Sequence, residues 1–598
     1  MNFNKTETEF IKYDRQSKPY IVNSIKNKKR FTKLQFEKIK NNRFTFTDFL
    51  NDNPFSEENI ELFGCPLCEK IYYSINNVDT LDTEQFIVSD FTYYFVNKLC
   101  IEIKQNSNDK SIYLKKNEIE KKCNVVIDKM FKKYKKQAIK KFNNIVTNIL
   151  ISHTSKAGYY TLKKFKDIEE WYLKFFLHNN VIDNFDNENT NIYDYLNEEQ
   201  SNAVIDCMNN KINFINGGAG VGKSTVAKNI VDNHINQLNI DNDRIFALAP
   251  TGIAVNILKN KLQDLIPISN IATIHRFQYL KFKKGFAIKT IIIDETSMIN
   301  IEHLTILKKL YDKNVFNYDT NFIFLGDLNQ LPPVCIGYFM KAMSEYYDFK
   351  QNELIEIKRQ QGGKLLELSK ALLTNTIFDY NTLLDDGTVI HIPHDTFDKT
   401  LFQLYEEIII DFNFYNMEEN MFITPQHEHK NIINNCFQTI LNSHNENINN
   451  KLKNNDYVMR TKNKYLKDEA TKEVLELYAN GDFGILTIKK NNSGDKEAFI
   501  NYKNKIEKLD SLDELEEFDP GYCRTVHKSQ GDEAKNVIFH MSSDWSPMVD
   551  KGSFRKNLIY TGLTRPKEKL YIVGDLNKFI NCCKHITNVK TIFTDIEQ

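Results

Sequence analysis

The segment INGGAGVGKST, residues 215–225, constrains this 598-residue chain most, because it brings four glycines together within six positions. Residues 217–224 fit the pattern G-x-x-x-x-G-K-[ST], between the apolar run INFIN and the helix-like STVAKNIVDNHI. Glycines let backbone N–H groups approach phosphate oxygens, and the helix N-terminus adds the positive end of its dipole. The segment therefore predicts a strand–loop–helix unit that binds a triphosphate, the alternative being an ordinary glycine-rich turn.

The predicted phosphate loop assigns roles to its side chains. Lys223 would reach the β- and γ-phosphates, and the Ser224 hydroxyl would hold Mg²⁺. The predicted ATP-binding residues of the loop are Gly217, Gly218, Ala219, Gly220, Val221, Gly222, Lys223, Ser224 and Thr225.

A second strand end supplies acidic groups. In TIIIDETSM, three isoleucines predict a buried strand, and Asp294 and Glu295 follow at its carboxyl end. Asp294 would complete the Mg²⁺ shell, and Glu295 would orient and deprotonate an attacking water. The alternative is a pair of carboxylates that are exposed by chance.

The chain from about residue 190 alternates short apolar runs with helix-like segments, which predicts an α/β fold with parallel sheets and crossover helices. KINFIN, IFALAP, KTIIID and NFIFLGD form a first set of runs, and TVIHI, MFITP, NVIFHM and KLYIVG a second. Between the second-set runs, NGDFGIL indicates a small β insertion at about 455–515, with Asn480-Gly481 as a type I′ hairpin turn.

Residues before about 190 predict a separate, mostly helical unit. Apolar residues at helical spacing predict a core helix with a basic outer face, formed by Ile119, Cys123, Val126, Met130, Tyr134 and Phe142. The lysine-rich stretches 26–43 and 129–141 would bind nucleic acid or simply form solvated surface.

Composition sets broad limits. The chain has equal numbers of basic and acidic residues, no long apolar run and no secretion-type start, so we expect a cytoplasmic protein, bacterial or viral, that does not enter a membrane. The ten cysteines lack regular spacing, which favours buried thiols. Cys65 and Cys68 form one CxxC pair, which would bind zinc only if folding brought Cys100 and Cys123 to it.

Nine motifs, in this order, carry a family resemblance. They are LNEEQSNAV, NGGAGVGKST, LAPTGIAVNIL, TIHRF, IIIDETSM, FLGDLNQLPPV, IEIKRQ, TVHKSQGDE and LIYTGLTRPKEKLYIVG. From about residue 191 to 575 the chain resembles superfamily 1 DNA helicases of the RecD/Dda branch. The resemblance implies two RecA-like domains, 189–346 (1A) and 347–454 with 519–598 (2A), after an N-terminal accessory domain, 1–188. It also implies a pin insertion at 277–289 (1B) and an SH3-like insertion at 455–518 (2B).

The resemblance implies further roles at the ATP site. Gln200 would read adenine, Gln330 would sense the γ-phosphate, and Glu533 would contact the nucleotide. Arg359 and Arg565 would be arginine fingers from the second domain, so that the site is completed only when the two domains close. For either arginine the alternative is a surface ion pair.

Single-stranded DNA would follow a track over both domains. The resemblance assigns to it Pro250, Thr251, Gly252, Thr273, His275, Thr525, His527, Lys528 and Ser529, although a histidine such as His275 is more often packed in a core. Phe282 and Phe286 would form a strand-separating pin at a DNA fork, or else cover the domain core.

Three functions remain open. The favoured one is a monomeric ATP-dependent DNA helicase that moves 5′ to 3′, in replication, recombination or repair. The second is a translocase that strips proteins from DNA, and the third is a motor recruited to a larger complex by a protein partner of residues 1–188. A further alternative for the N-terminal region is a nuclease strand at CIEIK, residues 100–104, with Asp90 upstream.

Overall fold

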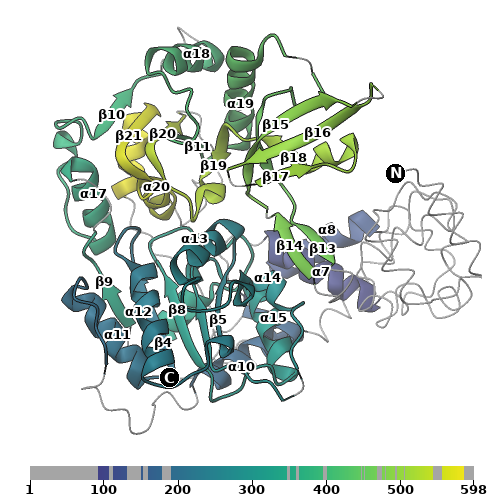
Figure 1. Cartoon of the computed structure of the whole chain (residues 1–598), viewed down its shortest axis with the longest axis vertical. Helices are drawn as coiled ribbons and strands as arrows, with labels where there is room; N and C mark the ends of the chain where they lie inside the picture. The colour runs from purple at the N-terminus through teal and green to yellow at the C-terminus, as the bar shows by residue number, and fades with distance from the viewer. Residues whose placement is uncertain are drawn as a thin grey trace, which may run out of the picture. The chain divides into compact units, whose positions relative to one another are not determined.

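The computed structural model describes residues 92–106, 112–130, 150–152, 159–177 and 190–584. Short gaps in the last range lie at 284, 347–350, 358–361, 395–399, 446, 450, 468–473, 479, 492–493, 504 and 543–554. The chain divides into two compact units, residues 1–167 with 594–598, and residues 168–593. Figure 1 shows the elements of both units along the chain.

The described part of the first unit combines helices with a small sheet. Its helices are α7 (Thr92–Asn106) and α8 (Lys116–Met130). Three short antiparallel strands, in the order β1-β3-β2, are β1 (Leu114–Lys115), β2 (Leu150–Ser152) and β3 (Tyr159–Leu162). The predicted core helix is present as α8, in which Ile119, Cys123 and Val126 are buried. The lysine stretch 26–43 and residues 131–142 lie outside the described residues.

A six-stranded parallel sheet forms the first α/β fold of the second unit, in the order β6-β5-β7-β8-β4-β9. Its strands are β4 (Ile212–Gly217), β5 (Ile245–Ala249), β6 (Ile271–Thr273), β7 (Thr290–Ile293), β8 (Asn321–Gly326) and β9 (Gln351–Leu354). The four apolar runs predicted as strands are β4, β5, β7 and β8. They are buried along their whole length, as expected for strands covered by helices on both faces.

Helices complete this first fold. They are α11 (Glu198–Asn209), α12 (Lys223–Asn236), α13 (Gly252–Leu262), α14 (Ile274–Phe277), α15 (Ile301–Asp312) and α16 (Phe339–Tyr346). A buried aliphatic core joins α11, α12 and α13 to the sheet. Because all six strands are parallel, their carboxyl ends share one edge, where ligands bind in such folds.

The structure corrects two predicted boundaries of this fold. The boundary between the two units lies between residues 167 and 168, inside helix α10 (Lys163–Leu177), about twenty residues before the predicted limit at 188. There Phe176 packs on Phe322 and Phe324 of β8, at centroid distances of 5.3 Å for both pairs. Strand β9 lies beyond the predicted limit at 346, but pairs with β4 and therefore extends the first sheet.

A five-stranded parallel sheet forms the second α/β fold, in the order β10-β21-β20-β11-β19. Its strands are β10 (Val389–Ile392), β11 (Asn420–Thr424), β19 (Cys523–Thr525), β20 (Ala534–Met541) and β21 (Pro566–Gly574). Its helices are α17 (Gly363–Thr374), α18 (Leu401–Asp411), α19 (His427–Asn442), α20 (Arg555–Leu563) and α21 (Leu576–Lys584). The four apolar runs of the second predicted set are all strands of this sheet.

The insertion between α19 and β19 is an antiparallel five-stranded sheet, in the order β17-β16-β15-β12-β18. Its strands are β12 (Tyr457–Arg460), β15 (Phe483–Lys490), β16 (Lys496–Tyr502), β17 (Lys505–Lys508) and β18 (Phe518–Pro520), and a ribbon of β13 (Lys464–Lys467) and β14 (Val474–Tyr478) leaves it. Asn480-Gly481 is not a type I′ hairpin turn, because only Gly481 has a positive φ, 96°, and β14 and β15 belong to different sheets.

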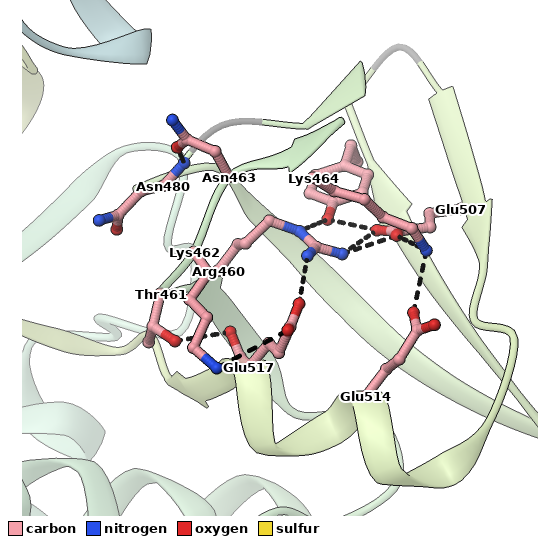
Figure 2. A network of polar contacts seen from close by, with 10 residues as sticks. Arg460, Thr461, Lys462, Asn463, Lys464, Asn480, Glu507, Glu514 and Glu517 are labelled. Atoms are coloured by element: carbon pink, nitrogen blue, oxygen red, sulfur yellow. Dashed lines mark hydrogen bonds and ion pairs between the residues drawn. The ribbon is translucent and has the colours of Figure 1, made fainter. Parts of the chain in front are cut away.

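A buried ionic network holds this insertion together (Figure 2). The Arg460 guanidinium is fully buried and donates to both carboxylate oxygens of Glu507, at 2.6 Å each. It also donates to Glu517 at 3.2 Å and lies 4.4 Å from the centroid of the Phe518 ring. Lys464 of the ribbon joins through Glu507 and Glu514, at 2.9 Å each. With each charge paired, the network fixes the ribbon to the sheet.

Candidate nucleotide and DNA sites

The predicted phosphate loop lies between β4, which ends at Gly217, and α12, which begins at Lys223. Gly220 and Gly222 have φ of 82° and 89°, in the left-handed region that glycine adopts without a steric penalty. The loop is also tightly enclosed, because a Cβ on Gly222 would lie 2.5 Å from Nε2 of Gln200. The described backbone is therefore the strand–loop–helix unit that the motif predicts.

Lys223 lies between the loop and two buried carboxyl groups. Its Nζ donates to the carbonyl oxygens of Gly217 and Gly218, at 2.6 and 2.9 Å. Burial raises the pKa of Asp294, which follows β7, to about 6, and the nearby Lys223 charge opposes that rise. Burial likewise raises the pKa of Asp327, after β8, against the same Lys223 charge. The lysine therefore compensates two acids at adjacent strand ends.

The residues present fit a magnesium ion. The Asp294 carboxyl and the Ser224 hydroxyl at the start of α12 are hard oxygen ligands, which Mg²⁺ prefers. Asp294 is 7% exposed, so a cation there would offset a buried charge. The adjacent Glu295 is only partly buried and has a left-handed backbone, with φ of 51°. Such backbone outliers in non-glycine residues cluster at functional sites.

Gln330 is buried beside Asp327. Its side chain is 2% exposed, and its Nε2 donates to Oδ2 of Asp327 at 3.3 Å. The other end of the amide, Oε1, has no hydrogen-bond partner among the described residues. A buried acceptor of this kind is available to a water or hydroxyl group that enters the site.

Arg565, predicted as an arginine finger, follows α20 and is 3% exposed. Its guanidinium donates to the carbonyls of Thr561 (2.9 Å), Ser529 (3.3 Å) and Asp532 (3.0 Å). These contacts hold it on the loop that was predicted to bind DNA. Arg359, the second predicted finger, lies outside the described residues.

Two further residues predicted to contact the nucleotide have protein partners. Gln200 donates from Nε2 to the Val221 carbonyl (2.7 Å), and its Oε1 accepts from the Asn197 N–H (3.1 Å). Adenine recognition would require Gln200 to exchange these bonds, so this role stays a prediction. Glu533 forms an ion pair with Lys567 at 2.6 Å, and its nucleotide contact is likewise still a prediction.

The sequence interpretation missed Tyr560 of the second fold. A Cβ on Gly218 would lie 2.6 Å from the Tyr560 hydroxyl oxygen, and the tyrosine is fully buried. Its burial beside Asp327 raises its pKa well above the ordinary value. Tyr560 precedes Arg565 by five residues within YTGLTRPK, and that proximity was the available signal. The interpretation also left Asp327 without a role.

The three threonines predicted to contact DNA share one structural setting. Each is the N-cap of a helical turn that follows a strand, and its hydroxyl accepts a backbone N–H from three residues ahead: Thr251 from Ala254, Thr273 from Arg276 and Thr525 from Lys528. Their hydroxyls are therefore already engaged locally. What these strand ends offer to a phosphate is mainly the remaining N–H groups at the start of each turn.

Thr251, predicted to contact DNA in the first fold, lies beside segments of the second fold and of the β insertion. A Cβ on Gly531 would lie 3.7 Å from Oγ1 of Thr251, and one on Gly481 would lie 3.6 Å from Cδ1 of Ile253. The β insertion and the loop after β19 therefore both meet the start of α13. At this junction Gly252 is buried and Pro250 is partly buried.

His527 and Lys528 are exposed at this junction, as a DNA contact requires. Ser529 is fully buried, and its hydroxyl donates to the Val526 carbonyl at 2.8 Å. The Ser529 hydroxyl therefore stabilises its own loop, and a DNA contact of this residue stays a prediction. His275 is exposed rather than packed in a core. Its ring lies 4.9 Å from that of His303, and partial desolvation lowers its pKa.

The predicted pin at 277–289 does not form a β-hairpin in the described residues. In this segment the Phe286 N–H donates to the Lys283 carbonyl at 2.9 Å in a tight turn, and Gly285 has φ of 84°. Phe282 packs 5.8 Å from Phe246 in the core, and stacks on Phe286 at 5.9 Å. These contacts match the alternative in which the two rings cover the domain core.

Two minor alternatives, a nuclease strand and a zinc site, concern the N-terminal region. Residues 100–104 are helical, within α7, and not a strand, so the nuclease interpretation is wrong at this point, while Asp90 lies outside the described residues. Burial raises the pKa of the Cys100 thiol to about 11 and that of Cys123 to about 12. The described residues contain no group of three or more metal-binding side chains, and Cys65 and Cys68 lie outside them.

No helix among the described residues is both long and apolar enough to span a bilayer.

Comparisons with known proteins agree with this geometry. Residues 200–336 match the family model of an AAA domain, and residues 520–573 that of a UvrD-like helicase C-terminal domain. The RecBCD enzyme subunit RecD of Buchnera aphidicola subsp. Acyrthosiphon pisum is 27% identical, over 65% of this chain and 74% of that protein. An uncharacterized protein of Methanocaldococcus jannaschii, MJ1519, is 25% identical over 95% of this chain. The chain spans 54% of that relative's length.

Solved structures with a similar fold include Pif1 helicases. Bacteroides Pif1 bound to single-stranded DNA aligns with a TM-score of 0.38 and 19% identity, over 64% of this chain and 92% of that one. Pif1 from Candida albicans aligns with a TM-score of 0.36 and 16% identity, over 67% and 98%.

The phosphate loop, the two acidic strand ends and the paired parallel sheets define a P-loop nucleoside triphosphatase with two RecA-like folds. Its ordered motifs, the UvrD-like C-terminal match and the RecD relatives then specify the group. These matches support a superfamily 1 helicase of the RecD-like type.

Proposed function

We propose that this protein is a monomeric ATP-dependent DNA helicase that moves along single-stranded DNA in the 5′ to 3′ direction. One observation supports the proposal. Arg565, predicted for the nucleotide site, donates to the carbonyls of Ser529 and Asp532, in the loop between β19 and β20 that carries the predicted DNA contacts His527 and Lys528. A change at the γ-phosphate can therefore move the DNA contacts directly.

The chemistry follows from the side chains at the strand ends. Lys223 and the loop N–H groups hold the phosphates, Glu295 orients and deprotonates the attacking water, and Gln330 contacts the γ-phosphate. Ser224 and Asp294 would hold Mg²⁺, which neutralises charge on the phosphates. Arg565, with Arg359, would stabilise the charge of the transition state when the second fold closes on the first.

The DNA contacts in this proposal are independent of base sequence. The strand-end N–H groups near Thr251, Thr273 and Thr525, with Lys528, would bind backbone phosphates as the cleft opens and closes. The polarity and a role in replication, recombination or repair rest on the RecD relatives alone.

Unwinding of tailed duplexes tests the proposal. The expected result is ATP-dependent strand separation with a 5′ single-stranded tail and little with a 3′ tail. Lys223→Ala should abolish separation while retaining much of the DNA binding. Separation only with a 3′ tail would overturn the polarity, and DNA-independent ATP hydrolysis without separation would overturn the helicase proposal.

A translocase that displaces proteins is the second candidate. The packing of Phe282 against Phe246 favours it, since a ring held in the core is less able to act as a wedge. Displacement of streptavidin from biotinylated single-stranded DNA, without separation of a tailed duplex, would support this second candidate. If the double change Phe282→Ala and Phe286→Ala reduces unwinding but spares ATP hydrolysis, the two rings act as a strand-separating pin.

A further inference from the structure

The loop that carries Gln330 belongs to the first fold but is bonded by the second. Asn557, in the first turns of α20, places its Nδ2 within hydrogen-bond distance of three consecutive carbonyl oxygens. These are Leu328 at 3.3 Å, Asn329 at 3.0 Å and Gln330 at 3.0 Å. An amide nitrogen has two hydrogens, so the three acceptors share them. One side chain thus spans the backbone of the loop up to Gln330.

The next residue of the loop, Leu331, is hydrogen-bonded to the second fold through both its N–H and its carbonyl. The Leu331 N–H donates to the Thr561 hydroxyl at 2.9 Å, and its carbonyl accepts from Nε2 of Gln530 at 3.2 Å. The Thr561 hydroxyl in turn donates to the Asn557 carbonyl at 2.7 Å. Asn557 and Thr561 are four residues apart and therefore lie on one face of α20.

The residues that form these hydrogen bonds are buried, so loss of one partner leaves the other unsatisfied. Gln330, Leu331, Gln530 and Thr561 are each at most 3% exposed, so water cannot readily replace a lost bond. The loop also keeps bonds within its own fold. The Leu328 N–H donates to Oδ1 of Asn216 at 3.1 Å, and the Asn329 N–H donates to Oδ1 of Asp327 at 2.9 Å. The second fold is therefore the partner of the Asn329, Gln330 and Leu331 carbonyls, while the beginning of the loop is held by the first fold.

We propose that Asn557 is a positioning residue that places the Gln330 amide for the γ-phosphate only while the two folds are closed. The inference rests on the proposed function, and it adds a dependence of γ-phosphate sensing on α20. When the folds separate, the bonds of Asn557, Thr561 and Gln530 to this loop break together. The loop then loses its backbone bonds to the second fold, and the Gln330 amide is left with its side-chain bond to Asp327.

The test is a double-mutant cycle between Asn557 and Gln330, with steady-state ATP hydrolysis measured at saturating single-stranded DNA. Asn557→Ala should lower kcat about ten- to a hundredfold, because a partly buried donor shared by three carbonyls is lost, with KM for ATP changed by less than about threefold. In a Gln330→Ala background the same change should lower kcat by less than about twofold.

Two variants separate donation from packing. Asn557→Asp has the same size but presents an acceptor to the three carbonyls, so it should be at least as impaired as Asn557→Ala. Lys556→Ala is the matched control, since Lys556 on the same helix bonds to Asn375 of its own fold. It should keep wild-type kcat and KM.

The outcomes distinguish the positioning role of Asn557 from the proposed helicase function. Losses that multiply in the double variant, or full activity of Asn557→Asp, would overturn the positioning role while the helicase proposal stands. A melting temperature lowered equally in both backgrounds, together with a raised KM, would show a purely structural role and overturn it too. Wild-type protein without DNA-stimulated hydrolysis would overturn the proposed function and this role together.

Discussion

Alanine at Gly218 should disable the protein through a clash between the two folds. A Cβ built there lies 2.6 Å from the Tyr560 hydroxyl oxygen, about 0.8 Å inside the 3.4 Å at which ordinary contact begins. Tyr560 is fully buried, so its ring has little room to withdraw. The clash exists only when the second fold is closed on the phosphate loop.

Overpacking of this kind costs about 1–3 kcal/mol. Because about 1.4 kcal/mol corresponds to a tenfold change, the closed arrangement should lose about 5- to 150-fold in population. DNA-stimulated kcat should fall by a similar factor, measured by phosphate release at saturating ATP and single-stranded DNA. Nucleotide binding to the first fold alone should change much less.

Removal of the hydroxyl should relieve the clash. Gly218→Ala with Tyr560→Phe should recover most of the kcat that Gly218→Ala loses, relative to Tyr560→Phe alone. Gly217→Ala is the matched control, because its Cβ would meet Val221 at 2.7 Å and Leu354 at 3.0 Å, both in the first fold. Tyr560→Phe should not rescue it. If Gly218→Ala costs the same factor with and without the hydroxyl, the tyrosine does not lie over the loop in the working enzyme.

Three further predictions concern stability. Asp294→Asn should raise the melting temperature at pH 7.5, since the buried carboxyl has its pKa raised from 3.8 to about 6, so its charged form costs stability above pH 6. The gain should vanish near pH 4; an equal gain at both pH values would refute it. Arg460→Ala breaks a buried ion pair and leaves Lys464 as the remaining cation on Glu507, so it should cost about 3–5 kcal/mol by chemical denaturation, against about 0–1 for exposed Lys508→Ala. Phe176→Ala should cost about 3–5 kcal/mol by the same measurement, and exposed Lys174→Ala under about 0.5; similar values would exclude α10 from the core.

The sheets and the phosphate site could be predicted because their signals are local. Runs such as the three isoleucines before Asp294 are apolar enough to identify buried strands, and the spacing of glycines around Lys223 specifies the loop. Strand β9, with the sequence QNEL, has no such signal, since its polar residues form a strand only by pairing with β4. The predicted end of the first fold, residue 346, therefore lies before β9, which belongs to that fold.

Contacts between distant segments could not be predicted. Leu331 and Thr561 are 230 positions apart, and no local pattern links them. Ser529 carries a hydroxyl of the kind that binds phosphate, yet this hydroxyl donates to the Val526 carbonyl of its own loop. Phe282 and Phe286 have the spacing of a pin, but Phe246 lies close enough to Phe282 to pack against it. In each case tertiary packing, which a linear pattern does not record, decides the role.

The most direct measurement is the rate of ATP hydrolysis with and without single-stranded DNA, for wild type and Lys223→Ala. The account predicts strong stimulation of the wild type by DNA, because Arg565 links the nucleotide site to the loop of His527 and Lys528, and no hydrolysis by the variant. Equal wild-type rates with and without DNA would contradict the coupling of these two sites.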